Sequence, residues 1–153
     1  MMTVVVGPPA AGKSTWVRAH ASAADVVIDY DLIAQALAGP GADTHDHTKA
    51  VSTLAHKARY AVIDEAVRHM ADTDIYLIHS MPSAKHLARY RRLGARVVTV
   101  DPGRSVVEQR VRTMRRPALM AAVTRWYSQS DKQAPTRTVT RQSSRSWYRT
   151  HKE

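Results

Sequence analysis

Hydrophobic and polar positions form short alternating blocks along the chain, and these blocks predict strands and helices in turn. Continuous apolar runs occupy residues 3–6, 26–29, 75–78 and 96–100, and their lengths are typical of strands that are buried on both faces. Segments with apolar residues at helical spacing follow these runs. The alternation predicts βαβ units, and so an α/β fold with a mainly parallel sheet of four or five strands and helices on both faces.

The longest helical pattern follows a turn-rich loop at residues 39–47 and runs from residue 48 to about residue 70. Its apolar positions recur at the spacing of one helix face, and they are Val51, Leu54, Ala55, Ala58, Ala61, Val62, Ala66 and Met70. We expect the helix to pack through this stripe. The other expected helices start at residue 13 or cover residues 32–37, 84–93, 104 to about 116, and 117 to about 127.

Composition narrows the class of protein. The 153 residues include no cysteine, which excludes disulfide scaffolds, thiolate zinc sites and cysteine nucleophiles, and favours a reducing compartment. No apolar run reaches the roughly 18 to 20 residues of a membrane span, and the N-terminus lacks the basic and apolar regions of a signal peptide. We therefore expect a cytoplasmic protein without a membrane partner, and the sequence leaves its oligomeric state open.

Positive charge is concentrated at one end of the chain. The formal net charge is +10, of which residues 1–103 contribute +1 and residues 104–153 contribute +9. Lysine and arginine neutralise phosphates, so this asymmetry predicts a polyanionic partner, either a nucleic acid or the phosphates of a nucleotide. The alternative is a solvated basic tail without a partner.

One motif indicates a specific chemistry. The segment Gly7-Pro8-Pro9-Ala10-Ala11-Gly12-Lys13-Ser14 matches G-x-x-x-x-G-K-[ST] between an expected strand and an expected helix, which is the context of a phosphate-binding P-loop. Its glycines let backbone N–H groups face a phosphate at the helix N-terminus, with both alanines expected at negative φ. We expect Lys13 to reach the β- and γ-phosphates, Ser14 to bind Mg²⁺, and Thr15 to complete the nucleotide site.

With the segment VIDYDLIAQAL that follows, this P-loop resembles the small P-loop kinases related to polynucleotide 5′-hydroxyl kinases and zeta-toxin-type kinases, many of them phage-encoded. The resemblance implies a P-loop NTPase kinase-type three-layer fold that uses ATP and Mg²⁺. It implies transfer of the γ-phosphate to a hydroxyl, and the basic final third favours the 5′-hydroxyl of a polynucleotide as the acceptor. A phage-encoded member would act in the host cytoplasm.

The resemblance also implies a catalytic base after the second strand. Asp31 falls at that position, and Asp29 lies two residues before it, on the same side of an extended chain. One aspartate would take the proton of the attacking hydroxyl, and the other would hold Mg²⁺ through water. We assign Asp31 as the base and Ser14 with Asp29 to the metal, although Asp31 could instead serve only as the N-cap of the helix at 32–37.

Family members have an arginine-rich lid after the last strand, and residues 104–127 correspond to it. The resemblance implies that Arg110 and Arg115 stabilise the transferring charge and that Arg112 and Arg116 bind the nucleotide. The alternative for any one of them is a solvated helix face. The kinase domain would then span residues 1–127, with a basic, flexible tail at 128–153.

The chain departs from the family pattern at two places, and both concern the substrate. Ala34 stands where polynucleotide kinases have an arginine that binds the substrate phosphate, and the third strand ends in His79-Ser80 rather than in a Walker B aspartate. His45 and His47, in the loop before the long helix, and His79, at a strand end, are candidate substrate contacts. Ala34 favours a nucleoside, nucleotide or sugar-nucleotide acceptor, and the missing acid favours an ATP-dependent nucleic-acid-binding switch without kinase activity.

Overall fold

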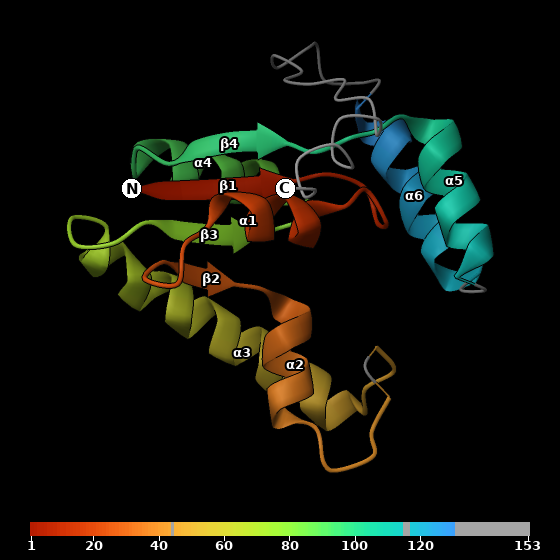
Figure 1. The fold of residues 1–153 in the computed structure, drawn as a ribbon, viewed down its shortest axis with the longest axis horizontal. Coiled ribbons are helices and arrows are strands. Elements are labelled where there is room, and N and C mark those ends of the chain that lie inside the picture. The colour runs from red at the N-terminus through yellow and green to blue at the C-terminus, as the bar shows by residue number, and fades with distance from the viewer. Residues whose placement is uncertain (44, 115–116, 131–153) are drawn as a thin grey trace, which may run out of the picture.

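A single parallel sheet forms the centre of the protein in a computed structural model, which describes residues 1–43, 45–114 and 117–130. Its strands are β1 (Met2–Val6), β2 (Val26–Ile28), β3 (Ile75–Ile78) and β4 (Arg96–Thr99), in the order β2-β3-β1-β4 (Figure 1). Val4 of the central strand pairs with Leu77 on one side and Val97 on the other. The predicted α/β fold of the P-loop NTPase kinase type is confirmed, with four strands in the described part of the chain.

Helices cover both faces of the sheet. They are α1 (Lys13–His20), α2 (Tyr30–Leu37), α3 (Lys49–Ala66), α4 (Ala84–Arg92), α5 (Arg104–Thr113) and α6 (Pro117–Ser130), with a 3₁₀ turn η1 (Val67–His69) after α3. The core clusters place α3 and α4 against one face and α1 against the other. The α5–α6 pair stands beyond the carboxyl ends of the strands (Figure 1). Residues 128–130 belong to α6, so the helix runs three residues past the predicted start of the tail.

The edge strand β2 is less buried than the sequence predicts. Val26 and Val27 are 37% and 40% exposed, and only Ile28 is buried in this strand. A continuous apolar run predicts burial on both faces, but β2 pairs only with β3 and lies at the edge of the sheet. The main core lies instead under β1 and β3, around Met2, Val4 and Leu77.

Helix α3 buries only part of the predicted stripe. Ala55 and Ala66 are buried as predicted, but Leu54 and Val62 are 55% and 41% exposed, and Arg59 and Ile63 are buried in addition. The reason is Arg59, which hydropathy assigns to solvent but which donates from Nη2 to the Ile78 carbonyl at 2.8 Å. This buried arginine brings α3 to the end of β3.

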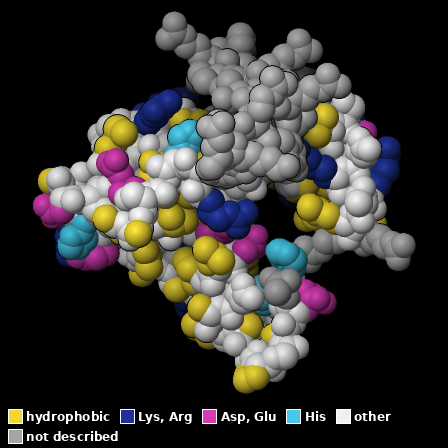
Figure 2. Space-filling view, in the orientation of Figure 1, with side chains coloured by type: hydrophobic (Ala, Val, Ile, Leu, Met, Phe, Trp, Pro, Cys, Tyr) yellow, Lys and Arg dark blue, Asp and Glu magenta, His cyan; other side chains and the backbone are white. Residues whose placement is uncertain are grey.

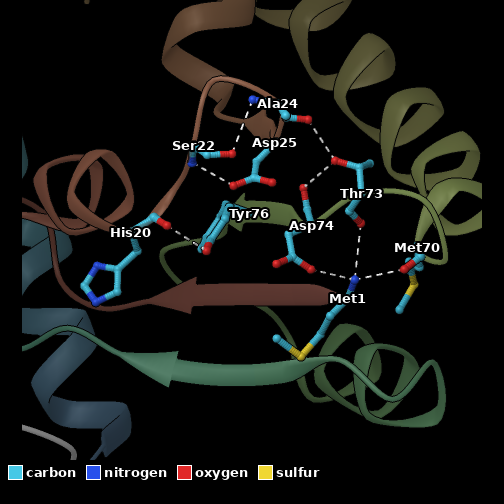
Figure 3. A network of polar contacts seen from close by, with 9 residues as sticks. All are labelled: Met1, His20, Ser22, Ala24, Asp25, Met70, Thr73, Asp74 and Tyr76. Carbon is cyan, nitrogen blue, oxygen red and sulfur yellow. Dashed lines mark hydrogen bonds and ion pairs between the residues drawn. The ribbon is translucent and has the colours of Figure 1, made fainter.

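A polar network joins the α1–β2 loop to the beginning of β3 (Figure 3). The Tyr76 hydroxyl donates to the His20 carbonyl at 3.1 Å, and the Thr73 hydroxyl donates to the Ala24 carbonyl at 3.0 Å. Asp25 accepts from the Ser22 N–H at 2.7 Å, and the hydrogen bonds from Ser22 lower the pKa of this carboxyl. These bonds fix the loop at the edge of the sheet that lies opposite the P-loop.

Two of the exposed large hydrophobic side chains belong to α2, namely Leu32 and Leu37, which are 57% and 46% exposed. Figure 2 shows a further feature of the surface. A hollow separates the α5–α6 pair from the body that contains the sheet. Within residues 1–43, 45–114 and 117–130, no helix is both long enough and apolar enough to cross a membrane.

Candidate nucleotide and phosphoryl-transfer site

The predicted P-loop connects β1 to α1, and two of its glycines are required by geometry. Gly7 has φ 151°, and a Cβ there would lie 2.1 Å from the Val100 carbonyl oxygen. The Gly7 N–H donates to the Ser80 carbonyl at 3.2 Å, which fixes the loop to the end of β3. Gly12 has φ 95° and is the N-cap residue of α1. The loop therefore bends back over the carboxyl edge of the sheet and leads directly into a helix N-terminus, where anions bind favourably.

Ala10 corrects one expectation about this loop. Both alanines were expected at negative φ, but Ala10 has φ 59°, in the left-handed region. This conformation costs a residue with a Cβ about 1–2 kcal/mol. The Ala10 carbonyl accepts a hydrogen bond from Arg110 Nη1 at 3.0 Å, which holds the strained peptide in place.

Lys13 is buried within the loop, with 8% of its surface exposed. Its ammonium donates to the carbonyls of Gly7 at 3.1 Å and Pro8 at 2.6 Å. Burial lowers the pKa of Lys13 to about 8, and the carboxylates of Asp29 and Asp31 partly oppose this shift. The lysine is thus positioned beside the loop backbone with two aspartates close enough to act on its charge.

Asp29 joins the loop to the second helix. It is 8% exposed, its Oδ2 accepts from the Ser14 hydroxyl at 3.3 Å, and its Oδ1 accepts from the Asp31 N–H at 3.1 Å. Asp29 is therefore the N-cap of α2. The alternative that Asp31 serves as the N-cap is wrong, because the helix begins at Tyr30, two residues earlier than predicted.

Asp31 lies in the first turn of α2 and is exposed. The helical backbone from Tyr30 onward means that the two aspartates do not share one side of an extended chain, as the sequence suggested. Both nevertheless line the same cavity of about 650 Å³, which lies between α1, β2 and α2. Four further residues also border it: Ser14, Arg18, His45 and Ile78. The residues that line the cavity therefore include one with a hydroxyl, two with carboxylates, one with a guanidinium and one with an imidazole.

The lid helices contact the P-loop directly. Ala11 of the loop packs with Val107 and Val111 of α5 and Val123 of α6 in one buried cluster. The Tyr127 hydroxyl donates to Asp101 Oδ1 at 2.7 Å, and burial together with this carboxylate raises the pKa of Tyr127. These contacts hold the lid against the site.

The four predicted lid arginines differ in position. Arg110 reaches the loop, as described above, whereas Arg112 is exposed and lies 3.6 Å from Glu108 on its own helix. Arg115 and Arg116 lie outside the described residues. Of the two arginines that the structure describes, only Arg110 contacts the P-loop.

The histidines lie in three different surroundings. His45 borders the cavity, and both ring nitrogens of His47 are enclosed without a hydrogen-bond partner among the described residues. His79 is buried, and its Nδ1 lies 2.9 Å from the Tyr90 hydroxyl. Burial, followed by the charges of Arg59 and His86, lowers the pKa of His79 to about 3. No group of three or more metal-ligating side chains occurs in the described part of the chain.

Ala34 is fully buried in α2, so it offers no surface to a ligand. Sequence reasoning did not identify three residues that lie at the cavity or at the end of β3: Arg18, Arg59 and Tyr90. Arg59 follows the buried Ala55 by four residues and precedes the buried Ile63 by four. This spacing is the only sequence signal that could have identified it, because arginine at a core position usually indicates a buried partner.

The family model of an AAA domain matches residues 2–148. The chain belongs to this family. It is a P-loop NTPase-like kinase family that includes members resembling polynucleotide kinases. No curated protein and no solved structure matches the chain. As a member of this AAA domain family, the protein is a P-loop nucleotide-binding, kinase-like ATPase.

Proposed function

We propose that the protein is a phosphotransferase that uses ATP and Mg²⁺ to phosphorylate a hydroxyl group. The observation that supports this most directly is the hydrogen bond between Ser14 and Asp29 beside the buried Lys13. It joins the P-loop hydroxyl to a carboxylate at the end of β2, which is separated from β1 by β3 in the sheet. The groups needed for phosphates, metal and proton transfer therefore lie at one junction.

The residues present fit the nucleotide and the metal. Backbone N–H groups of residues 12–15, at the N-terminus of α1, and the ammonium of Lys13 suit phosphate oxygens, and the oxygens of Ser14 and Asp29 are ligands that Mg²⁺ prefers. When bound, Mg-ATP supplies the phosphoryl group and neutralises part of its charge. Ser14 and Asp29 would hold the metal without a Walker B aspartate, since His79 stands at that strand end.

Asp31 would accept the proton of the acceptor hydroxyl. Its carboxylate borders the cavity and accepts no hydrogen bond from the described residues, whereas both oxygens of Asp29 already accept one. A base must have a lone pair free to receive the proton and must be oriented by a rigid element. The first turn of α2 provides that support for Asp31.

The arginines would stabilise charge on the transferring group. Arg110 is already held at the P-loop by the Ala10 carbonyl, and a guanidinium suits the equatorial oxygens of a phosphoryl group. We assign Arg115 the same role and Arg112 and Arg116 to the nucleotide, on the basis of the family resemblance.

The acceptor we favour is the 5′-hydroxyl of a polynucleotide, because residues 104–153 have a net charge of +9. A small acceptor is the second candidate, since the cavity of about 650 Å³ falls in the range of sites for single small molecules. In either case His45 borders the path of the acceptor, and His47 and His79 are further candidate contacts.

The test is a transfer assay with γ-labelled ATP and Mg²⁺, which offers a 5′-hydroxyl oligonucleotide beside nucleosides and nucleotides. We expect label on the oligonucleotide, lost in Lys13→Ala and Asp31→Asn and kept in Asp72→Asn, which changes an exposed aspartate before β3. Label on a small acceptor alone would show that the substrate is this small molecule and not a polynucleotide. ATP binding without any transfer would refute the kinase function and favour a nucleotide-dependent switch.

A further inference from the structure

A buried arginine lies at the carboxyl end of β3, where it contacts the strand backbone. Arg59 of α3 is 6% exposed. Its Nη2 donates to the Ile78 carbonyl at 2.8 Å, and its Nε is enclosed without a hydrogen-bond partner. None of the ion pairs among the described residues includes it. A single carbonyl does not compensate a buried guanidinium, because a buried charge is costly unless an opposite charge accompanies it.

The charge of Arg59 acts on the pair formed by His79 and Tyr90. Burial and then this charge lower the pKa of His79, whereas burial raises the pKa of Tyr90 and the guanidinium charge partly opposes that rise. His79 contacts the ring of His86, with 5.4 Å between ring centroids. When the Tyr90 hydroxyl donates to Nδ1 of His79, the remaining ring nitrogen of the neutral imidazole is a further N–H donor. The carboxylate whose charge reaches Tyr90, that of Asp64, is engaged in an ion pair with Arg89 and not with Arg59.

Ile78 lies between the cluster and the cavity that we propose for the acceptor. Its carbonyl accepts from Arg59, and the residue also borders the cavity that Asp29 and Asp31 line. The cluster thus lies on the α3–α4 side of the β3 terminus, and the cavity lies on the other side. Ligands of open parallel sheets bind beyond the carboxyl ends of the strands, which is where both features lie.

We propose that Arg59, with His79 and Tyr90, forms an oxyanion subsite that binds an anionic group of the acceptor other than the hydroxyl that is phosphorylated. This inference rests on the proposed phosphotransferase function and narrows its substrate class to acceptors with a phosphate or carboxylate near the reacting hydroxyl. A polynucleotide end meets this condition through its first internucleotide phosphate, and a nucleoside 3′-monophosphate meets it as a small molecule. Arg59 on α3 would then select acceptors with an anionic group, although Ala34 on α2 replaces the arginine that polynucleotide kinases use for this purpose.

The test measures discrimination between two ligands that differ only in the anionic group. The protein is saturated with Mg²⁺ and a non-hydrolysable ATP analogue, and a nucleoside 3′-monophosphate and its parent nucleoside are titrated by calorimetry. We expect the wild type to bind the monophosphate about 10- to 100-fold more tightly, the range of charge-assisted hydrogen bonds. Arg59→Gln should reduce this ratio to within about threefold of unity, and Arg59→Lys, which keeps the charge without the planar fork, should give an intermediate ratio.

Arg68→Gln is the matched control. Arg68 lies in η1, directly after α3, and forms an ion pair with Glu65, so its loss removes an arginine that already has a partner and lies outside the cluster. It should leave the discrimination ratio unchanged. If Arg59→Gln does not fold at the assay temperature, the wild type and Arg59→Lys decide the question.

Three results would overturn the subsite: equal binding of the two ligands by the wild type, no measurable binding of either, or an unchanged ratio in the Arg59 variants. A residue that only secured the end of β3 would change the melting temperature and leave the ratio intact. A transfer assay with the same two ligands separates the subsite from the function. Preferential binding without transfer would refute the kinase proposal alone, and transfer at equal kcat/KM to both ligands would refute the subsite alone.

Discussion

Replacement of Asp29 should separate its structural role from its proposed metal role, because each carboxylate oxygen has one hydrogen bond. Oδ1 caps α2, and Oδ2 accepts from Ser14. Asp29→Ala removes both, which costs about 1 kcal/mol for the cap and a similar amount for the second bond. Asp29→Asn removes the charge but keeps a residue that caps helices as well as aspartate does, so its cost should stay below about 0.5 kcal/mol.

These values translate into distinct melting temperatures. In a chain of this size each kcal/mol corresponds to about 2–4 °C, so thermal unfolding should show about 4–8 °C of destabilisation for Asp29→Ala and at most about 2 °C for Asp29→Asn. Transfer of the γ-phosphate, measured across a Mg²⁺ titration, should fall on the order of 100-fold in both variants, because both lack the carboxylate. Stability and activity would then separate in the asparagine variant.

Thr48→Ala provides the control. The Thr48 hydroxyl caps α3 by accepting from the Val51 N–H at 3.3 Å, so this change removes a cap of the same kind away from the P-loop. It should lower the melting temperature and leave the Mg²⁺ dependence as in the wild type. The reasoning is refuted if Asp29→Asn retains the activity and Mg²⁺ dependence of the wild type, since Asp29 would then be a helix cap only.

Three further changes test the loop itself. Gly7→Ala places a Cβ 2.1 Å from a backbone oxygen and should abolish nucleotide binding in a filter assay. Gly12→Ala meets no clash but puts a Cβ on a backbone with φ 95°, so it should weaken binding less. Ala10→Gly relieves a left-handed conformation, so chemical denaturation should show a gain of about 0.5 kcal/mol after the entropic cost of glycine, and a loss would contradict the strain. Lys13 has its folded pKa near 8 instead of 10.5, so the unfolded chain binds more protons between these values and stability rises with pH there. Lys13→Met should remove this rise from the denaturation midpoints, and an unchanged pH dependence would refute it.

The sequence predicts features that depend on local geometry and misses those that depend on position in the sheet. The P-loop is recognisable because its glycines, lysine and serine act within eight consecutive residues. Strand β2 has the composition of a buried strand, yet its two valines are exposed because sheet order places it at the edge. Nothing in a run of three apolar residues reveals whether a neighbour covers it.

The boundary of α2 shows a second kind of ambiguity. Two aspartates, Asp29 and Asp31, each favour the N-cap position, and the sequence gives no means to choose between them. The choice is made by the Ser14 hydroxyl, which is distant in sequence and donates to Asp29. The contact of Arg110 with Ala10 is also beyond sequence reasoning, because it joins residues one hundred positions apart.

The end of β3 explains how this protein can have His79-Ser80 where relatives have an acid. Here the backbone, rather than a carboxylate, makes the connections: the Ser80 carbonyl accepts from Gly7, and the Ile78 carbonyl accepts from Arg59. Gly7 in turn accepts from Lys13. Hydrogen bonds on either side of the backbone at residues 78–80 thus connect the lysine of the P-loop with the buried arginine of α3. If an anion binds at Arg59, it does so against a strand that also positions the nucleotide loop, so the acceptor and the nucleotide would be aligned by the same rigid element.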